Sequence, residues 1–554
     1  MTNDSTPPDS SPLKPLKASA PDSIDAAAAP IASTEPSALQ RRDFIKVAGA
    51  GAGALLVGGA SRADAAPLLS ATATRSVRSA SASPEIVVIG AGAWGSFTAM
   101  NLQKMGAKVT VVDAYGPGNA RSTSGDETRG VRSSYGDKTG QLGELWMLWA
   151  RESMKRWIAF DDEWGKYLRL NLFHVTGDLI MRSEWDNFQL RCKVWWDKNK
   201  IPYQILNPDD VRKSFPVIGM DDITAVLYEP DAGVVRARRA TQAASAVFEK
   251  LGGKLVIGRA TPSKISNGRL EEITLDTGAT LRADTFVYCV GPWLGKTFPE
   301  LFAKKTRVPI GYVCYFATPA GDHRFTFPNL PSYNFPGVTG WPALPVDNRG
   351  FRVRGAERAP TPPGQTVANG AAGAPPSAPP TAPVPGRPNT DTGSNLSNAA
   401  GAGGRGAAGG RGGAGGGGGG GNQQQDVPLA QQDPDTSDRW ADQTRIDGSR
   451  RFIAHRFPLL KDAPIAQTHA CHYESTSSGN FIIDKHPQWG NVWIAAGGNA
   501  EGFKFAPKIG NYVATRVLGD EGDPAIAKVF RIPEKEYEPT PPPTPADSTK
   551  KPPG

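Results

Sequence analysis

The chain has 554 residues, and its 63 glycines and 49 prolines exceed what one packed domain normally uses, so part of it is not globular. The formal net charge of +8 comes from scattered cations without an aromatic-interleaved basic block, which argues against nucleic-acid binding. The 4 cysteines lie far apart and show no C-x-x-C spacing, so we expect neither a metal site nor a disulfide framework.

The N-terminal residues 1–65 contain a candidate export signal. The first forty or so residues are rich in Ser, Pro, Ala and Asp, with too little apolar content to fold. Arg41 and Arg42 then precede a weakly apolar stretch at residues 47–60 and a small-x-small cleavage pattern at residues 63–65. This order resembles a twin-arginine signal, so we expect the twin-arginine export machinery to carry the folded chain to the periplasm. A basic linker or a single membrane anchor is the alternative.

Two further segments have a biased composition. Residues 359–432 pass from Pro/Ala repeats into a glycine run, and residues 534–554 contain a proline cluster. These compositions predict a flexible insertion and a Pro-rich tail. Because loop closure costs only about 0.6 kcal/mol per doubling of length, such an insertion can interrupt a domain without dividing it. The folded body is therefore expected at residues 84–358 and 433–533.

The first patterned segment predicts a dinucleotide-binding unit. The β-branched run Glu85–Ile89 is typical of a parallel strand that is buried on both faces. A G-x-G-x-x-G turn follows, then an apolar helical stretch that stops near Gly106, then a second strand at Lys108–Asp113. A glycine-rich turn in an unrelated α/β fold would not require an acidic residue at the end of the second strand.

Each part of this motif has a physical role in binding a dinucleotide. Gly90 permits the tight turn, Gly92 lets a diphosphate approach the backbone, and Gly95 lets the helix and strand pack closely. The helix N-terminus faces the phosphates, and the carboxylate of Asp113 can accept hydrogen bonds from a ribose hydroxyl group. The motif by itself does not distinguish FAD from NAD.

Two blocks at opposite ends of the body resemble one family. The first is GDETRGVRSSYG at residues 125–136, and the second lies at residues 471–505, with FIIDKHP in its middle. Their order and spacing resemble the monomeric sarcosine oxidase and N-methyltryptophan oxidase family of the D-amino-acid oxidase superfamily. The resemblance implies an α/β fold, in which a Rossmann-like FAD-binding lobe is interlocked with an α+β substrate lobe whose antiparallel sheet roofs the flavin.

The resemblance also implies roles for individual residues. Cys471 matches the position whose sulfur bonds to the flavin 8-methyl carbon. Arg129 matches a position against the flavin, and a cation near this thiol could lower its pKa. Arg132 and Lys504 match positions that hold the substrate carboxylate, and two cations on one carboxylate would orient the substrate for hydride transfer.

Three positions depart from the family pattern. Arg352 stands where the oxidases use a lysine that assists reaction with oxygen, and a planar guanidinium is not equivalent to an ammonium group. Ser124 replaces a family histidine and is still expected at the cofactor, together with Gly502 and Phe503. Thr339 replaces a substrate-side tyrosine. Oxygen and another electron carrier both stay open as the acceptor.

The leading hypothesis is a monomeric FAD-dependent enzyme that oxidises a small secondary or N-methylated amino acid, of which sarcosine is the simplest in this family. Hydride would pass from the α or methyl carbon to the flavin. One alternative is a dehydrogenase of another amino or hydroxy acid that passes electrons to a carrier other than oxygen. The other alternative is a flavin-binding protein without turnover.

Overall fold

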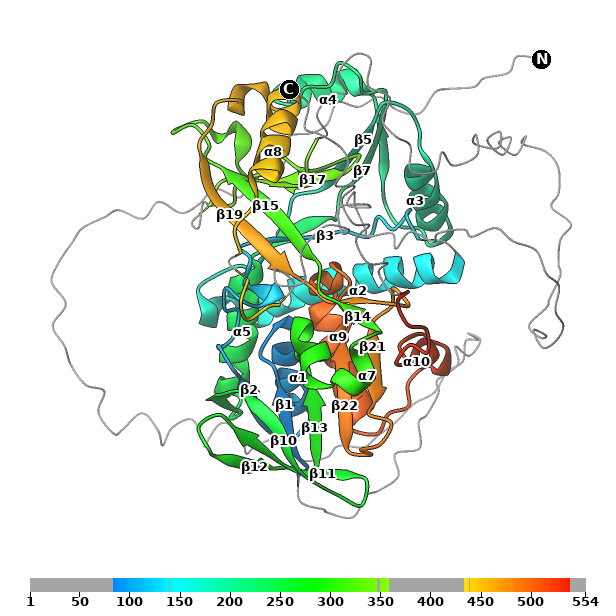
Figure 1. Ribbon diagram of the computed structural model, residues 1–554. Coiled ribbons are helices and arrows are strands. Elements are labelled where there is room, and N and C mark those ends of the chain that lie inside the picture. The colour runs from blue at the N-terminus through cyan, green and yellow to red at the C-terminus, as the bar shows by residue number, and fades with distance from the viewer. Residues whose placement is uncertain (1–82, 139, 346–348, 358–432, 438, 539–554) are drawn as a thin grey trace, which may run out of the picture. The chain divides into compact units, whose positions relative to one another are not determined.

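The computed structural model describes residues 83–538 except 139, 346–348, 358–432 and 438 (Figure 1). By their contacts, the described residues fall in one compact unit. The export signal within residues 1–65, the insertion at 359–432 and the tail from residue 539 onward lie outside the described residues and stay predictions. In the part of the chain that is described, no helix is both long and apolar enough to cross a membrane.

The dinucleotide motif folds as predicted, with strand β1 (Glu85–Ile89), helix α1 (Ala93–Lys104) and strand β2 (Lys108–Asp113). β1 lies inside a six-stranded sheet of order β21-β22-β13-β1-β2-β9, which is parallel except at its edge strand β21. The other strands of this sheet are β9 (Lys254–Ile257), β13 (Thr285–Tyr288), β21 (Ile482–Lys485) and β22 (Val492–Ala496). Sequence-distant segments therefore meet at β1.

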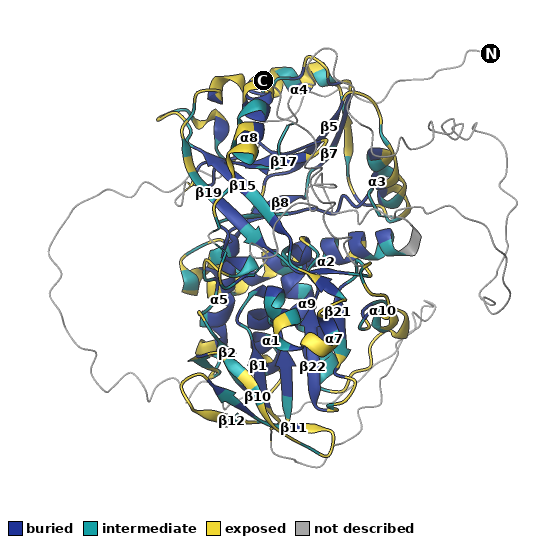
Figure 2. Cartoon of the chain, in the orientation of Figure 1, coloured by how far each residue is buried: buried dark blue, intermediate teal, exposed yellow. Residues whose placement is uncertain are grey.

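Different elements cover the two faces of this sheet, because successive side chains of a strand point to opposite sides. Ile86 and Val88 belong to the core that α1 shares with α5 and α9, whereas Val87 and Ile89 pack against a three-stranded sheet. The covering elements are α5 (Ala237–Lys250), α9 (Ala506–Val517), β10 (Ala260–Ser266), β11 (Arg269–Leu275) and β12 (Thr280–Arg282). Burial along the whole of β22 follows from cover on both faces (Figure 2).

The second lobe is built on an eight-stranded sheet of order β19-β15-β18-β17-β16-β5-β7-β6. All its strand pairs are antiparallel except β16 with β5. Its strands are β5 (Asp178–Arg182), β6 (Gln204–Leu206), β7 (Ala225–Glu229), β15 (Ile310–Phe316), β16 (Ser332–Phe335), β17 (Val338–Trp341), β18 (Phe351–Arg354) and β19 (Ile465–His472).

The eight-stranded sheet has one apolar face and one face that carries charge. Phe351 and Val353 of β18 lie in a core with residues of α8 (Gln443–Arg456). Because side chains alternate along a strand, Arg352 and Arg354 of β18 point to the other side. The sheet therefore buries its apolar face under a helix and turns its cationic face towards the first lobe.

Smaller elements complete the two lobes. Strands β3, β4 and β8 form a further antiparallel sheet, and β14 pairs with β20. The bounds are β3 (Arg129–Val131), α2 (Gly140–Leu168), β4 (Phe173–Val175), α3 (Asn187–Lys198), α4 (Pro208–Ser214), β8 (Gly233–Val235), α6 (Leu294–Thr297), α7 (Pro299–Phe302), β14 (Thr306–Arg307), β20 (Ser475–Thr476) and α10 (Pro524–Val529). The predicted fold class, a Rossmann-like lobe interlocked with an α+β lobe on an antiparallel sheet, is confirmed.

Residues 433–437, directly after the undescribed segment, are held against the first lobe by one carboxylate. Asp435 Oδ1 accepts hydrogen bonds from the Tyr115 hydroxyl at 2.7 Å and Trp293 Nε1 at 2.8 Å, and Oδ2 accepts one from Lys296 Nζ at 2.6 Å. Burial acts to raise the pKa of Asp435, but these hydrogen bonds outweigh it and hold the pKa below its usual range. The chain thus re-enters the fold at a fixed point.

Replacing Asp435 by Asn removes the negative charge and leaves an amide nitrogen that cannot accept hydrogen bonds. We expect residues 433–437 to detach locally, at a loss of about 1–2 kcal/mol, because hydrogen bonds to a charged but partly exposed group are lost. Hydrogen–deuterium exchange of these residues measures the effect. Asp462→Asn is the control, because that side chain is 88% exposed and lies 3.9 Å from Lys461. Equal exchange in both variants would contradict the prediction.

Candidate active site

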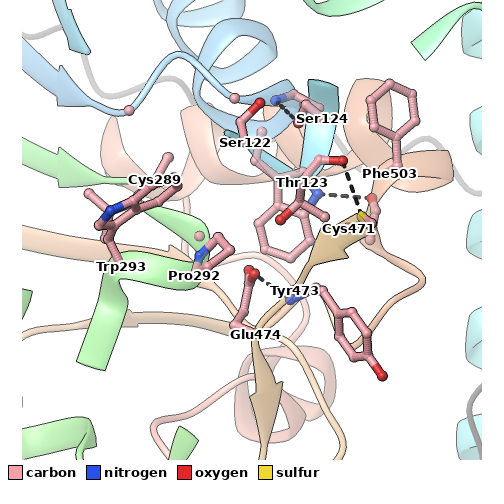
Figure 3. Close-up of a pocket in the computed structure, with 18 of the residues that line it drawn as sticks. Ser122, Thr123, Ser124, Cys289, Pro292, Trp293, Cys471, Tyr473, Glu474 and Phe503 are labelled. Atoms are coloured by element: carbon pink, nitrogen blue, oxygen red, sulfur yellow. Dashed lines mark hydrogen bonds between the residues drawn. The ribbon is translucent and has the colours of Figure 1, made fainter. Parts of the chain in front are cut away.

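A pocket of about 400 Å³ lies between the six-stranded sheet and the cationic face of the eight-stranded sheet. One end is lined by the turn after β1, by Asp113 and by Trp293 (Figure 3). The other end is lined by side chains of β15, β17, β18 and β19 and by the 3-10 helix Gly502–Phe505. Because these segments come from both ends of the chain, the pocket forms only when the two lobes are folded together.

The glycine turn at the first end is closely packed on one side and open on the other. A Cβ atom on Gly90, whose φ is +103°, would lie 2.3 Å from the Cys289 carbonyl oxygen, and one on Gly95 would lie 1.8 Å from the Gly90 carbonyl oxygen. A Cβ atom on Gly92 would meet only Ser124 Oγ, at 3.5 Å. Gly92 faces the pocket, so its backbone is accessible to a diphosphate.

Asp113 ends β2 at the wall of the pocket, where its carboxylate shapes the turn. Its Oδ2 accepts a hydrogen bond from the Ala91 amide at 2.6 Å, and its Oδ1 accepts from the amides of Tyr115 and Gly116 at 2.8 and 2.7 Å. Burial raises the pKa of this carboxyl group, against the three backbone hydrogen bonds. The open glycine, the helix N-terminus and this acid together fit an adenine dinucleotide.

Cys471 lies on β19 and opens towards the middle of the pocket. Its Sγ accepts a hydrogen bond from Arg129 Nη2 at 3.0 Å and lies 3.7 Å from the Thr123 carbonyl oxygen (Figure 3). The residue opposite on β15 is Gly311, which has no side chain to cover the sulfur. All four cysteines are free, and the other three are buried. The geometry places a thiol beside a cation at the pocket wall.

One buried carboxylate, Asp126, holds two of the predicted arginines. It is 1% exposed and forms ion pairs with Arg129 and, at 3.2 Å, with Arg352 Nη2. Its other oxygen accepts a hydrogen bond from the Tyr315 hydroxyl at 2.7 Å. The Arg352 guanidinium also stacks on the Trp341 ring, 4.0 Å from its centroid. Both arginines line the pocket in orientations that the protein itself determines.

Arg132 and Lys504 line the same pocket from separate segments. Arg132 Nε lies 4.0 Å from Asp178 Oδ2, a long ion pair, and Lys504 Nζ donates a hydrogen bond to the Tyr135 hydroxyl at 2.8 Å. Burial, followed by repulsion from Arg132, lowers the pKa of Lys504 to about 8. Two buried cations near each other, with few anionic partners of their own, are suited to bind a carboxylate.

The pocket brings together nearly all of the residues proposed from sequence. Those that line it are Gly90, Gly92, Asp113, Ser124, Arg129, Arg132, Arg352, Cys471, Gly502, Phe503 and Lys504, and Thr339 lines it as well. Gly95 lies behind the turn, where it packs on Gly90. The Ser124 hydroxyl has a structural role as well, because its Oγ accepts a hydrogen bond from the Ala93 amide at 2.9 Å (Figure 3).

Sequence reasoning missed several side chains of the pocket. Arg354 follows Arg352 by two positions, so the alternation of a strand could have placed both on one face. Glu474 and Glu501 also line the pocket and lie inside the recognised block at residues 471–505. Neither glutamate has a sequence pattern that separates it from a surface residue.

A mostly parallel sheet with a dinucleotide turn, joined to an antiparallel sheet that carries a pocket cysteine and arginines, is the arrangement expected of a flavin-dependent oxidoreductase. Comparison with protein families gives the same class. The DAO family model, described as FAD dependent oxidoreductase, matches residues 85–516. The chain belongs to this family of FAD-dependent oxidoreductases.

Curated relatives extend over most of the chain at low identity. L-saccharopine oxidase of Schizosaccharomyces pombe is 23% identical over 466 residues, which cover 78% of this chain and 90% of the relative. Monomeric sarcosine oxidase of a Bacillus species is 23% identical over 464 residues, which cover 81% of this chain and 95% of the relative. The chain is an FAD-dependent oxidoreductase of the sarcosine oxidase kind.

Solved structures show the same fold. The fructosamine oxidase Amadoriase II of Aspergillus fumigatus aligns with a TM-score of 0.60 at 19% identity, covering 82% of this chain and 90% of that one. L-proline dehydrogenase of P. horikoshii aligns with a TM-score of 0.58 at 17% identity, covering 81% of this chain and 97% of that one. At these identities the likeness shows the fold alone.

The glycine turn offers a matched pair of substitutions. Gly95→Ala should destabilise the fold by about 1–3 kcal/mol, because its Cβ would overlap the Gly90 carbonyl oxygen. Gly92→Ala should cost at most about 1 kcal/mol, because its Cβ meets only Ser124 Oγ and the change is limited to a weaker N-cap of α1, yet weaken FAD binding by obstructing the diphosphate. Thermal unfolding and FAD titration, both in a Cys471→Ser background, separate the effects. Normal FAD affinity in Gly92→Ala would refute this placement of the diphosphate.

Proposed function

We propose that this enzyme oxidises a carbon–nitrogen bond of a small secondary or N-methylated amino acid. The observation that carries the proposal is the placement of Arg132 and Lys504 in the same pocket as the dinucleotide turn. A carboxylate bound by these two cations lies in the pocket that the flavin shares. The names of the curated relatives, a sarcosine oxidase and a saccharopine oxidase, agree with an amino-acid substrate of this type.

The chain's own residues supply binding and orientation. Arg132 and Lys504 would each attract the substrate carboxylate by roughly 4 kcal/mol at an effective dielectric constant near 20, before the cost of desolvating the charges. Tyr135 holds the Lys504 ammonium group through its hydroxyl oxygen and so orients it. The flavin, when bound, accepts the hydride, and the protein contributes position and exclusion of water.

The acceptor that reoxidises the flavin is a separate part of the proposal. Arg352 is held by Asp126 and stacked on Trp341, so its charge is fixed in place and its guanidinium cannot lose a proton as an ammonium can. Because of this difference from a lysine, a carrier other than oxygen is the second candidate for the electron acceptor. Hydrogen peroxide formed per turnover distinguishes the two, since an oxidase forms one molecule for each substrate oxidised.

Anaerobic mixing with secondary amino acids should bleach the flavin spectrum. Arg132→Met should lower the second-order rate constant for this reduction by about 10- to 100-fold, because a charge-assisted contact with the carboxylate is lost. Stopped-flow absorbance measures the rate. Arg282→Gln, a variant of a 71% exposed side chain on β12, is the control and should behave as the native enzyme. If no amino acid in a broad panel bleaches the flavin, a flavin-binding protein without turnover replaces this proposal.

We further propose that Cys471 attaches the flavin covalently. Cys471 lines the pocket, and Arg129 Nη2, 3.0 Å from its sulfur, would stabilise negative charge there for bonding to the flavin 8-methyl carbon. Such a bond would replace one S–H and one C–H bond, releasing two protons and two electrons, and the enzyme's electron acceptor would remove the electrons. Cys471 pairs across the sheet with Gly311, so the residue opposite has no side chain that could cover the sulfur.

Acid precipitation tests the attachment. The native protein should give a yellow pellet, and Cys471→Ser should give a colourless one, since a noncovalent flavin dissociates when the protein unfolds. Cys314→Ser is the matched control, because Cys314 lies on β15 but faces the core on the other side of the sheet, and its pellet should stay yellow. A yellow pellet from Cys471→Ser would exclude this cysteine as the tether.

A further inference from the structure

The pocket contains more positive charge than one substrate carboxylate needs. Its cationic wall carries the side chains of Arg129, Arg132, Arg352, Arg354 and Lys504. Asp126 is the carboxylate that pairs with two of them, Arg129 and Arg352. Arg132 and Lys504 suffice for the carboxylate of the proposed amino acid. Neither the ion pairs of Asp126 nor the binding of one substrate carboxylate explains the presence of Arg354.

Arg354 lines the pocket, and no ion pair with an acidic residue is found for it among the described residues. It lies at the end of β18, between Val313 of β15 and Thr339 of β17, and both of these neighbours also line the pocket. Within the described residues, its guanidinium forms no hydrogen bond or ion pair with the protein. Burial lowers the pKa of Arg354, and the positive charges of Arg352 and Arg132 act in the same direction, whereas Tyr473 and Cys471 nearby act to raise it. Its five N–H donors are therefore available to a ligand.

Arg352 adds positive charge on the same face. It is only 2% exposed, and although Nη2 reaches Asp126, its Nε and Nη1 atoms have no hydrogen-bond partner among the described residues. Because residues i and i+2 of a strand point the same way, the positive charge of Arg352 lies on the same face as Arg354, but its unpaired Nε and Nη1 atoms are buried, so Arg354 is the residue of the two that offers N–H groups to the pocket. The two residues form what we call the β18 arginine pair.

A buried guanidinium with unpaired donors is unfavourable unless an anion approaches it. A carboxylate matches the fork of a guanidinium with two parallel hydrogen bonds, whereas a neutral group does not. Arg132 directly follows β3, and Lys504 lies in the 3-10 helix Gly502–Phe505. The β18 arginine pair lines the pocket from the eight-stranded sheet. Two anion-binding walls therefore face one pocket.

We propose that the β18 arginine pair binds a second carboxylate, so that the substrate is an amino dicarboxylate with one acid group on each side of the secondary nitrogen. The inference rests on the proposed function and makes its substrate class more specific. Anchoring both ends holds the reacting carbon–nitrogen bond between the two walls. Oxidation moves a hydride to the flavin, and water then splits the imine into a primary amino acid and an oxo acid.

Iminodiacetate and its monoamide test the second carboxylate with the flavin-loaded enzyme. The two compounds have nearly the same size, but the amide carries no charge at one end. We expect a second-order rate constant for flavin reduction about 10- to 100-fold higher for the diacid, as for loss of a charge-assisted hydrogen bond. Glycine and glyoxylate are the products expected from the diacid. N-(2-carboxyethyl)glycine and N-(3-carboxypropyl)glycine, each with its monoamide, extend the test to longer arms.

Arg354→Gln should abolish the preference by slowing the diacid, while the monoamide rate changes by less than about threefold. Arg354→Lys, which keeps the charge but not the fork, should retain part of the preference. Arg324→Gln is the matched control, because Arg324 is 56% exposed and pairs with Asp322 away from the pocket. If Arg354→Gln slows diacid and monoamide equally, or lowers flavin content instead, the residue serves the flavin and the inference is wrong.

A binding measurement keeps this inference separate from the proposed function. Thiodiacetate and its monoamide replace the amine by sulfur, so they bind without oxidation of a carbon–nitrogen bond, and the visible spectrum of the flavin reports their binding. Tighter binding of thiodiacetate to the native enzyme than to Arg354→Gln supports the site even if no amine is oxidised. Oxidation of monoacids without any preference for a diacid would overturn the second carboxylate and leave the proposed function intact.

Discussion

The carboxylate of Asp126 is the interaction on which the arrangement of the pocket depends. It is buried, and it joins Arg129 of β3 to Arg352 and Tyr315 of the eight-stranded sheet. Breaking a buried ion pair by removing one partner costs about 3–5 kcal/mol, because the remaining charges lose their compensation. One anion thus holds both walls of the pocket together and fixes the direction of two guanidinium groups.

The alternation of side chains along the strands then decides what each wall presents. On β18, Phe351 and Val353 enter the apolar core under α8, and the arginines between and after them enter the pocket. On β15, Cys314 faces the core while Val313 faces the pocket. The same strands therefore stabilise the lobe through one face and determine ligand chemistry through the other, so a change of register would remove both at once.

The charges that line the pocket belong to two groups with different proposed roles. The dinucleotide turn and the cations Arg132 and Lys504 fit the cofactor and the carboxylate that an amino-acid oxidoreductase requires. The β18 arginine pair, Arg352 and Arg354, adds positive charge that Asp126 compensates only in part. We propose that this additional positive charge, and not the fold, selects the substrate, because many activities share one fold.

The sequence by itself determined the elements whose signals are local. The strand–turn–helix at residues 85–104, the acid at Asp113 and the family motifs near Arg132 and Lys504 follow from spacing and residue type, and the fold class built on them is confirmed. Only the tertiary structure showed that Arg354 lines the pocket beside Arg352 and that Asp435 returns to the first lobe. Partners and burial depend on residues far apart in the chain, which no local pattern records.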